Sequence, residues 1–176
     1  MNEVRQILKA IEQYAEAYNR LEDMQKKTMS GQLPIGDQKT GVIGEFYTKI
    51  YLESIHPDAK IAYGNPSQRG WDLEIEAGPK CIRVQVKTVS EYSNARRISP
   101  IHSDWDQLFL VYLDKKFLPV ALWEIADTSI VPRRGVLKNR TMPKPGDPKS
   151  GSVAFANRKD RLAELLQAIQ RIKGEL

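Results

Sequence analysis

The chain has very little of the chemistry that builds disulfide frameworks and zinc sites. Among its 176 residues are one cysteine, Cys81, and two histidines, His56 and His102. A single cysteine excludes a disulfide within the chain, and both histidines lack partners at the spacing of zinc ligands. We therefore expect no zinc site, and we expect Cys81 to pack within a hairpin rather than to act as a nucleophile.

The chain also lacks long apolar runs. Hydrophobic residues make up 41% of the sequence and charged residues 28%, a balance that suits a globular domain and leaves no segment long enough to cross a bilayer. The first nine residues do not combine an apolar core with a small-residue cleavage site, which is the pattern of a secretory leader. We therefore expect no membrane association and a cytoplasmic location.

A chain of this length suits one domain with its own apolar core. Its segments differ in hydrophobic period and in the density of turn-forming and basic residues. We expect a single domain over residues 1–176, with an N-terminal helix at 2–27, the core of the fold at about 40–125, a basic loop at 127–152 that is mobile or binds a partner, and a C-terminal helix at 157–174.

The two terminal helices are predicted from apolar residues that recur at three- and four-residue steps. In the first helix the stripe includes Leu8, Ile11 and Ala15, and it either packs on its own domain or forms the seam of a homodimer. In the last helix Asn157 is expected to cap the N-terminus, and leucines and isoleucines form the apolar face.

A second helix is predicted from Thr40, as its cap, to about Ile55, where His-Pro follows. Nearly its whole circumference is apolar, as in a helix that lies between a sheet and another helix. Its narrow polar strip consists of Glu45, Lys49 and Glu53. These three side chains are either a surface ladder of ion pairs, or Glu45 points at a site on the sheet.

A β-hairpin is predicted between Trp71 and Thr88, with its turn at 77–80. The first strand alternates acidic and aliphatic residues from Asp72 onward, and the second carries Arg83, Gln85 and Lys87 on one face. Each strand therefore has one solvent-exposed polar face. If the turn is tight, Glu74 or Glu76 lies opposite Arg83, and Asp72 lies near Gln85 and Lys87 at the open end.

Two further strands follow the hairpin, and a short one precedes it at 59–63. Leu108–Leu113 is a continuous apolar run of strand length, and a tight turn leads from it to a second run at Leu118–Ile125. Such runs are typical of strands that are buried on both faces.

The side chains at the open end of the hairpin have the chemistry of a hard-cation site. Mg²⁺ binds oxygen ligands and keeps several waters, so one or two carboxylates can suffice when a phosphate supplies the rest. Asp72 is the first-choice ligand, the carbonyl oxygen of Val86 and the side chain of Gln85 are further ligands, and Glu45 can assist through a water. Lys87 would hold or deprotonate the attacking water. The alternative is that Gln85 and Lys87 are merely exposed residues of an amphipathic strand.

Positive charge gathers around and after the hairpin, within a formal net charge of +5. Such clusters favour polyanionic partners, although a basic loop exposed to water is the plain alternative. The basic residues expected to contact a nucleic acid are Arg69, Arg96, Arg97, Arg133, Arg134, Lys138 and Arg140.

The order of helix, strand, hairpin and strand resembles the PD-(D/E)XK nuclease superfamily, with Gly44-Glu45 in the helix, Gly70-Trp71-Asp72 opening one strand and Gln85-Val86-Lys87-Thr88 in the next. The resemblance covers about residues 40 to 125. It implies a restriction-endonuclease-like αβββαβ core, an α/β fold of the α+β type whose central mixed β-sheet is flanked by helices. The chain departs from the family pattern at Trp71, where proline is usual, and at Gln85, where a carboxylate is usual.

The resemblance implies Mg²⁺- or Mn²⁺-dependent hydrolysis of phosphodiester bonds. Asp72 would then be the metal ligand, Gln85 the auxiliary ligand and Lys87 the catalytic lysine, with Glu45 supporting the metal. Our first hypothesis is a DNA endonuclease, with DNA favoured over RNA, that acts as a homodimer to cut both strands. The second hypothesis is a catalytically inactive protein of the same fold that binds nucleic acid or another protein.

Overall fold

The computed structural model describes residues 3–28, 39–64, 70–132 and 135–174. Its helices are α1 (Glu3–Thr28), α2 (Thr40–Ile55) and α3 (Leu162–Lys173), with short 3-10 turns at Thr128–Ile130 and Val153–Phe155. Its strands are β1 (Lys60–Tyr63), β2 (Leu73–Ala77), β3 (Lys80–Ser90), β4 (Ile101–His102), β5 (Gln107–Leu113), β6 (Pro119–Ile125), β7 (Val136–Leu137) and β8 (Lys159–Asp160). No helix within the described ranges is long and apolar enough to cross a membrane.

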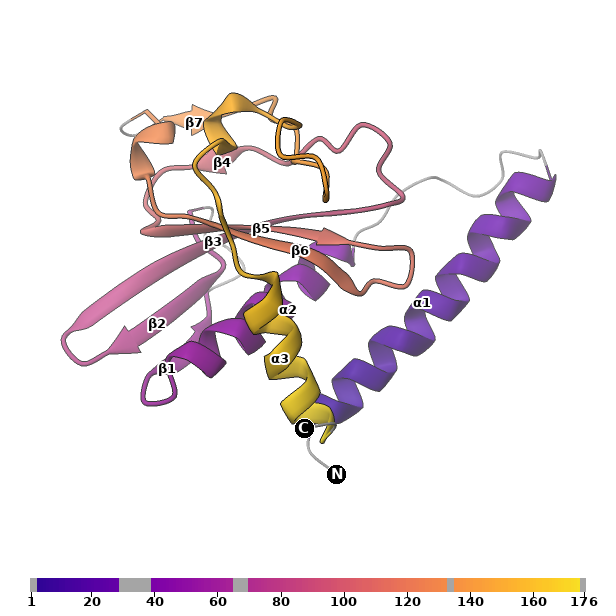
Figure 1. Ribbon diagram of the computed structural model, residues 1–176, viewed down its shortest axis with the longest axis horizontal. Coiled ribbons are helices and arrows are strands. Elements are labelled where there is room, and N and C mark those ends of the chain that lie inside the picture. Colours follow the sequence, from indigo (N-terminus) through magenta and orange to yellow (C-terminus); the bar gives the residue numbers. More distant parts are fainter. Residues whose placement is uncertain (1–2, 29–38, 65–69, 133–134, 175–176) are drawn as a thin grey trace.

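The fold is of the mixed α/β class, with a central mixed sheet flanked by helices, as predicted. The main sheet has the strand order β1-β2-β3-β5-β6-β8. Strands β3 and β5 are parallel, and the other neighbours are antiparallel. Strands β4 and β7 form a separate antiparallel pair. Figure 1 shows this pair on one side of the main sheet and the three helices on the other.

The sheet is buried on both faces because two separate apolar clusters cover it. Phe109 and Val111 of β5 belong to the cluster that contains the helices. Leu108 and Leu110 belong to the cluster under β4 and β7. Alternate residues of a strand point to opposite faces, so a strand between two apolar layers needs a continuous apolar sequence. This explains the run in β5 that indicates a buried strand from the sequence alone.

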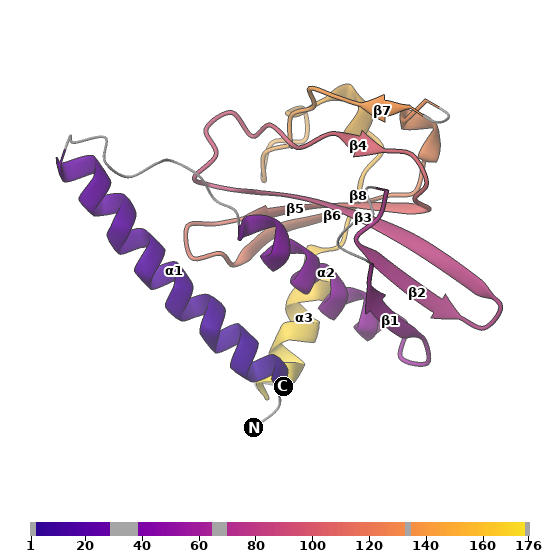
Figure 2. The ribbon, with the colours of Figure 1, turned by 180° about the vertical axis from the view of Figure 1, so that it is seen from behind.

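The apolar stripe of α1 packs on its own domain, which was one of the two expected fates. Leu8, Ile11 and Ala15 are buried in the helix-side cluster, and Tyr18 lies against Phe117 with ring centroids 5.4 Å apart. Figure 2 shows α1 and α3 on the same side of the sheet as α2. The stripe is therefore used within the chain, and a homodimer would need another surface.

The order of elements differs from αβββαβ at one place. That pattern has a helix between the third and fourth core strands, whereas the described residues 91–106 contain the short strand β4 and turns. The connection from β3 to the parallel strand β5 therefore runs over the face opposite α2. Likewise, the predicted loop at 127–152 contributes β7 and the buried side chains of Leu137 and Met142 to this layer.

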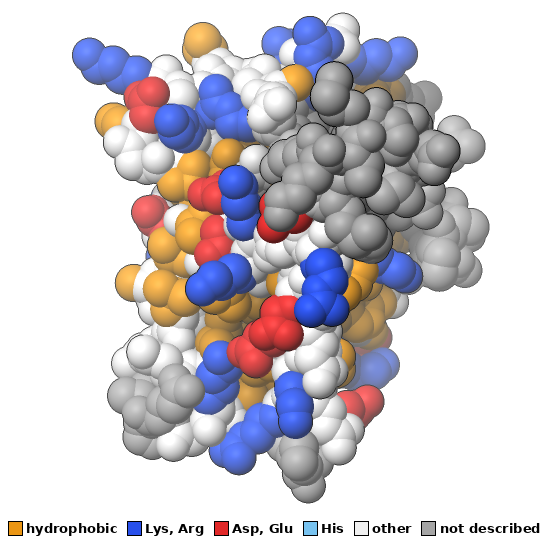
Figure 3. Space-filling view, turned by 90° about the vertical axis from the view of Figure 1, so that its right-hand side faces the viewer, with side chains coloured by type: hydrophobic (Ala, Val, Ile, Leu, Met, Phe, Trp, Pro, Cys, Tyr) orange, Lys and Arg blue, Asp and Glu red, His pale blue; other side chains and the backbone are white. Residues whose placement is uncertain are grey.

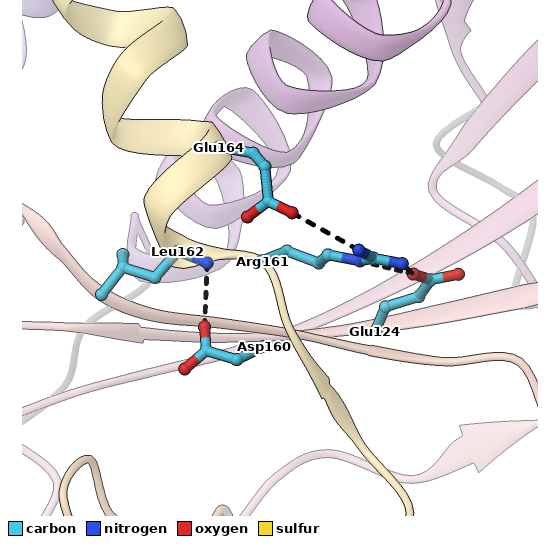
Figure 4. Close-up of polar contacts among 5 residues, drawn as sticks. All are labelled: Glu124, Asp160, Arg161, Leu162 and Glu164. Carbon is cyan, nitrogen blue, oxygen red and sulfur yellow. Dashed lines mark hydrogen bonds and ion pairs between the residues drawn. The ribbon is translucent and has the colours of Figure 1, made fainter.

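Two predicted helix caps are wrong. Lys39, not Thr40, is the N-cap of α2, and the Thr40 side chain is buried in the first turn. The last helix begins at Leu162 rather than after Asn157, because Lys159 and Asp160 pair with β6 as strand β8. The Asp160 Oδ1 atom accepts a 2.9 Å hydrogen bond from the Leu162 backbone N–H, which starts the helix (Figure 4).

Arg161 fixes the start of α3 to the sheet. Its guanidinium lies 2.8 Å from a carboxylate oxygen of Glu124 on β6 and 3.4 Å from one of Glu164 on α3, and Figure 4 shows it between the two carboxylates. The Glu124 side chain is only 13% exposed, so this pair is less screened by water than a surface ion pair. It joins α3, which packs against α2, to β6, the neighbour of the edge strand β8.

Candidate functional site

The predicted hairpin forms with the expected turn. Ala77 pairs with Lys80 across a two-residue turn, Glu74 lies opposite Arg83, and Leu73 lies opposite Val84. The Asp72 backbone N–H donates to the Val84 carbonyl at 2.8 Å, so the pairing continues past the first residue of β2. The next pair in this register brings Asp72 opposite Gln85.

Asp72 directly precedes β2, at the end of the hairpin where β3 extends beyond its partner strand. Because β2 begins at Leu73, the backbone N–H of Val86 lies beyond the end of that strand. The Asp72 Oδ2 atom accepts a hydrogen bond from this N–H at 2.7 Å. Burial raises the pKa of the Asp72 carboxyl, and the Val86 N–H and the Lys87 ammonium oppose that rise. The carboxylate is therefore held in one place beside β3.

Lys87 lies partly buried on β3, on the face away from the helices. Its Nζ atom donates a hydrogen bond to the Oγ atom of Ser99 at 3.1 Å. Burial lowers the pKa of the lysine, whereas Asp72 and then Glu45 act to raise it. A lysine with a lowered pKa and two carboxylates nearby is suited to hold or transfer a proton.

Glu45 approaches the same place from α2. Burial, and next the charge of Asp72, raise the pKa of Glu45 to about 7, and the charge of Lys87 opposes the rise. The ion pair on the polar strip of α2 joins Lys49 to Glu53. The charge of Glu45 therefore interacts with those of Asp72 and Lys87 on the hairpin. That it points at the site stays a prediction.

Glycine at position 44 allows this approach. A Cβ atom built on Gly44 would lie 1.9 Å from the Oγ1 atom of Thr88 and 2.8 Å from its Cβ atom. Both distances are too short for real contacts, so α2 can lie this close to β3 only without a side chain at position 44. The same close approach brings the neighbouring residue Glu45 to the hairpin.

Gln85 is buried, whereas the sequence predicts it on an exposed polar face of the strand. Its side chain is 1% exposed, so the expected exposed polar face of β3 is wrong at this position. The layer that carries β4 and β7 covers this face, where Leu108 and Leu110 also lie. The Nε2 atom of Gln85 donates to the carbonyl oxygen of Gly70 at 2.9 Å. The amide thus holds the chain two residues before Asp72.

The structure brings Glu45, Asp72 and Lys87 together from α2, the start of β2 and β3. Each of the three influences the pKa of at least one of the others, so their charges interact. Ser99 also contacts the site, through Lys87, and no sequence pattern indicates it. A residue that reaches a site from a distant loop can be found only once the pairing of that loop is known.

Trp71 is a second residue near the site to which the sequence analysis gives no role. Its indole Nε1 atom donates to a carboxylate oxygen of Glu74 at 2.6 Å, and the guanidinium of Arg83 lies 4.2 Å from the centre of its ring. Trp71 precedes Asp72 directly. Its contacts with both strands of the hairpin therefore limit the movement of the carboxylate.

Cys81 is exposed, so the expectation that it packs in the hairpin is wrong. It lies opposite Glu76 near the turn, and Figure 1 shows this end of the hairpin projecting from the body of the protein, where neither layer covers it. Within the described ranges no group of three or more histidine, cysteine or acidic side chains is placed to hold a metal ion.

Four of the seven predicted nucleic-acid contacts lie on the β4–β7 layer. Arg97 forms an isolated antiparallel bridge with Thr141, the Ile98 N–H donates to the carbonyl of Arg140, and Arg96 Nη1 donates to the carbonyl of Met142. These contacts join the basic segment around Arg96 to the one that contains Lys138 and Arg140. The other three predicted contacts, Arg69, Arg133 and Arg134, lie outside the described residues.

No family model and no curated protein matches the chain. Among solved structures, the chain is similar to a bacterial homing endonuclease, with 12% sequence identity over 77% of this chain and 96% of the other, and a TM-score of 0.42. A TM-score below 0.5 does not establish a common fold. A function for this chain therefore has to be argued from the site itself.

The raised pKa of Glu45 predicts how stability depends on pH when no metal is present. The folded state keeps a proton on Glu45 up to about pH 7, whereas the unfolded chain releases it near pH 4 to 5. The stabilising contribution is therefore complete below about pH 4 and is lost as pH rises through about 7. We expect the melting temperature in chelator to fall by a few degrees between pH 5 and pH 8.

The matched variants are Glu45→Gln and Glu53→Gln on the same helix. The Glu45→Gln variant should lose most of this decline, because it cannot ionise. The Glu53→Gln variant should keep it, because Glu53 is 46% exposed and pairs with Lys49. Thermal unfolding followed by circular dichroism measures both, and an unchanged decline in Glu45→Gln contradicts the assignment.

Proposed function

We propose that the chain is a metal-dependent nuclease that hydrolyses phosphodiester bonds of DNA, of the PD-(D/E)XK type. The observation that carries the proposal is the convergence of Glu45, Asp72 and Lys87 at the open end of the hairpin. Side chains with strongly perturbed pKa values, shifted by burial together with a specific charge partner, cluster at functional sites. The two carboxylates can hold a divalent cation and the lysine can stabilise the charge that develops on a phosphate, which are the functions that metal-dependent phosphodiester hydrolysis needs.

The donor set fits Mg²⁺ or Mn²⁺. Two half-buried carboxylates repel each other, and the charge of Asp72 is one of the causes that raise the pKa of Glu45. A divalent cation between them would relieve this repulsion. Mg²⁺ needs only one or two carboxylates when waters and a phosphate complete its six oxygens. Asp72 and Glu45 would hold the cation, with the carbonyl oxygen of Val86 as a further proposed ligand.

The bound cation would polarise the phosphate and lower the pKa of a coordinated water. The residues of the chain would do the rest. Asp72, held by the Val86 N–H, would keep the cation at a fixed place relative to β3. Lys87, whose pKa is lowered by burial, orients the attacking water and offsets the charge that develops on the phosphate. Ser99 holds the ammonium of Lys87 in this direction.

Gln85 supports a second candidate, a catalytically inactive protein that binds nucleic acid. The amide that stands where a ligand would be expected is buried and bonded to Gly70. If the cation needs a side-chain ligand at this position, the site binds it too weakly for turnover. The nuclease proposal instead needs Gln85 only to hold Gly70, and through it Asp72.

Substitution of Gln85 by glutamate separates these roles. We expect Gln85→Glu to destabilise the protein by about 2–3 kcal/mol, because it loses the donor to Gly70 and buries a carboxylate against a carbonyl oxygen. Gln85→Met removes the hydrogen bond without adding charge and should cost less. Thermal unfolding and Mn²⁺ titration measure both effects. Tighter metal binding in Gln85→Glu without loss of stability would show that position 85 is a ligand position.

The proposed activity is tested by incubating the purified chain with supercoiled plasmid, single-stranded DNA and RNA. Each substrate is tested with Mg²⁺, with Mn²⁺ and with chelator, and beside Asp72→Ala and Lys87→Ala. We expect cleavage of DNA that needs the cation and is lost in both variants. Cleavage that survives both substitutions overturns the site, and binding without cleavage favours the inactive candidate. A homodimer and a cytoplasmic location stay predictions.

A further inference from the structure

We propose that the hydroxyl of Tyr63 donates a hydrogen bond to the phosphate next to the scissile one, which makes Tyr63 a further substrate contact of the site. The inference rests on the proposed function and deepens it, because it assigns a contact with the DNA strand on the helix side of the sheet. Tyr63 is the last residue of β1. Three observations support the contact: the exposure of the ring, the pairing of β1, and the lack of a hydrogen-bond partner for the hydroxyl among the described residues.

Tyr63 carries the most exposed aromatic ring of the chain. Its exposed fraction is 50%, whereas every other tryptophan, tyrosine and phenylalanine, all within the described ranges, is buried or half-buried. A ring in water lacks the stabilisation that burial of its large apolar area would give. A single exposed side chain needs no special explanation by itself, so what matters is where the ring lies.

The pairing of β1 places Tyr63 beside the segment that carries Asp72. Tyr63 lies opposite Leu73, the residue that follows Asp72. The backbone N–H of Gly64 donates to the carbonyl oxygen of Asp72 at 2.9 Å. A Cβ atom at Gly64 would lie 3.3 Å from the carbonyl oxygen of Trp71, so the two segments approach closely. Tyr63 is therefore held in register with the start of β2.

Tyr63 faces the helices. Residues directly opposite each other in an antiparallel pair point to the same face of the sheet, and Leu73 is buried in the helix-side cluster. The pKa of the Tyr63 phenol is raised by burial, then by the charges of Glu45 and Glu53 on α2. Lys87 lies on the opposite face of the sheet. Tyr63 and Lys87 therefore approach the end of the hairpin from opposite sides.

Tyr63 is a hydrogen-bond donor in surroundings that are otherwise acidic. Its hydroxyl forms no hydrogen bond with any described residue, and Lys49, the cation on the polar strip of α2, is paired with Glu53. Around α1, Figure 3 shows basic side chains interspersed with acidic ones, so this part of the helix side is not a continuous basic surface. A phosphate that approaches from the helix side therefore meets Glu45 and the hydroxyl of Tyr63.

A phenol in this position suits a phosphate oxygen. A tyrosine ordinarily titrates near pH 10, and the raised pKa of Tyr63 keeps its hydroxyl protonated at neutral pH. Tyrosine hydroxyls are among the groups that contact phosphates in protein–DNA complexes, where such contacts fix the position of the strand. The cation and Lys87 would engage the scissile phosphate, which leaves Tyr63, on the other face, to the neighbouring one.

Two substitutions at position 63 separate the hydroxyl from the ring. Tyr63→Phe removes the hydroxyl alone, and Tyr63→Leu removes the ring as well. The matched control is Tyr51→Phe on α2, whose phenol interacts with Arg161 and Glu124 instead. In single-turnover cleavage with subsaturating enzyme, both position-63 variants should be about 10- to 100-fold slower, the loss of one hydrogen bond to a charged acceptor. Melting temperatures of the Tyr63 variants should not change, and the control should cleave normally.

The contacted phosphate is located by a chemical substitution in the DNA. In a methylphosphonate a methyl group replaces one non-bridging oxygen, which removes the charge and an acceptor. Duplexes carry this group one phosphate to either side of the cleavage position. At the contacted position Tyr63→Phe and the unchanged protein should cleave at the same lowered rate, within about twofold, because the hydrogen bond is already absent. At the other position the difference of about 10- to 100-fold should persist.

Equal cleavage by Tyr63→Phe and the unchanged protein overturns the proposal, as does a loss that persists at both methylphosphonate positions or an equal loss in Tyr51→Phe. The same comparison is made for binding, by fluorescence anisotropy in Ca²⁺, which takes oxygen ligands as Mg²⁺ does. If the chain binds DNA without cleaving it, the nuclease function fails and the binding data decide the contact of Tyr63. A chain that neither binds nor cleaves DNA removes both proposals.

Discussion

Replacing Lys87 with alanine is expected to lower the rate of DNA cleavage about 10²- to 10³-fold, the loss typical when one group that stabilises transition-state charge is removed. The charge of Lys87 acts to lower the pKa of both Asp72 and Glu45. Binding of duplex DNA should change less than about threefold, because the ammonium is partly buried and bonded to Ser99 rather than free to meet the backbone. Single-turnover cleavage with saturating enzyme measures the chemical step.

The matched control is Lys80→Ala, at the first residue of the same strand. Lys80 is exposed beside the turn, so this variant should cleave at the rate of the unchanged protein. Melting temperatures of both variants exclude unfolding as the cause of a lower rate. Undiminished cleavage by a folded Lys87→Ala variant removes the lysine from the mechanism.

Replacing Gly44 with alanine is expected to destabilise the protein by about 3 kcal/mol, at the upper end of the usual cost of overpacking. The new Cβ atom would lie 1.9 Å from Thr88 Oγ1 and 2.7 Å from Thr88 Cγ2. The helix and the strand must therefore move apart. Because Glu45 follows directly, cleavage by the folded fraction should fall as well, since the carboxylate moves with the helix.

Two further variants isolate the cause of this loss. Gly41→Ala lies on the same helix with nothing within 4 Å of its new Cβ atom, so it should be neutral or stabilise by up to about 1 kcal/mol. The double variant Gly44→Ala/Thr88→Ala keeps only the contact with the Thr88 Cβ atom, at 2.8 Å, and should recover much of the stability. Denaturant unfolding measures all four proteins. A Gly44→Ala variant as stable as Gly41→Ala contradicts the close approach.

The sequence predicted those parts of the fold that depend on local pattern. The runs at 108–113 and 118–125 became β5 and β6 within one residue, because strands buried on both faces require largely apolar sequence. The hairpin turn at 77–80 was predicted because Gly-Pro between alternating strands leaves few alternatives. The caps at Thr40 and Asn157 failed, since tertiary contacts of the neighbouring residues decide where each helix begins.

The site was predictable only in part, because some of its contacts depend on residues that are distant in sequence. Asp72 and Lys87 could be brought near each other from hairpin register alone, and Glu45 from its place beside Gly44. The burial of Gln85 could not be predicted, because the layer that covers it consists of distant segments. The contact of Ser99 with Lys87 depends on the same long-range pairing, which no local period encodes.

The most direct test of the account is whether Asp72 and Glu45 hold a divalent cation between them. Mn²⁺ binding to the DNA-free protein can be followed by electron paramagnetic resonance, which counts free and bound Mn²⁺. We expect Asp72→Asn and Glu45→Gln each to weaken binding at least about tenfold, while Glu53→Gln, on the same helix as Glu45 but paired with Lys49, leaves it nearly unchanged. Equal Mn²⁺ binding by Asp72→Asn and the unchanged protein would contradict the account.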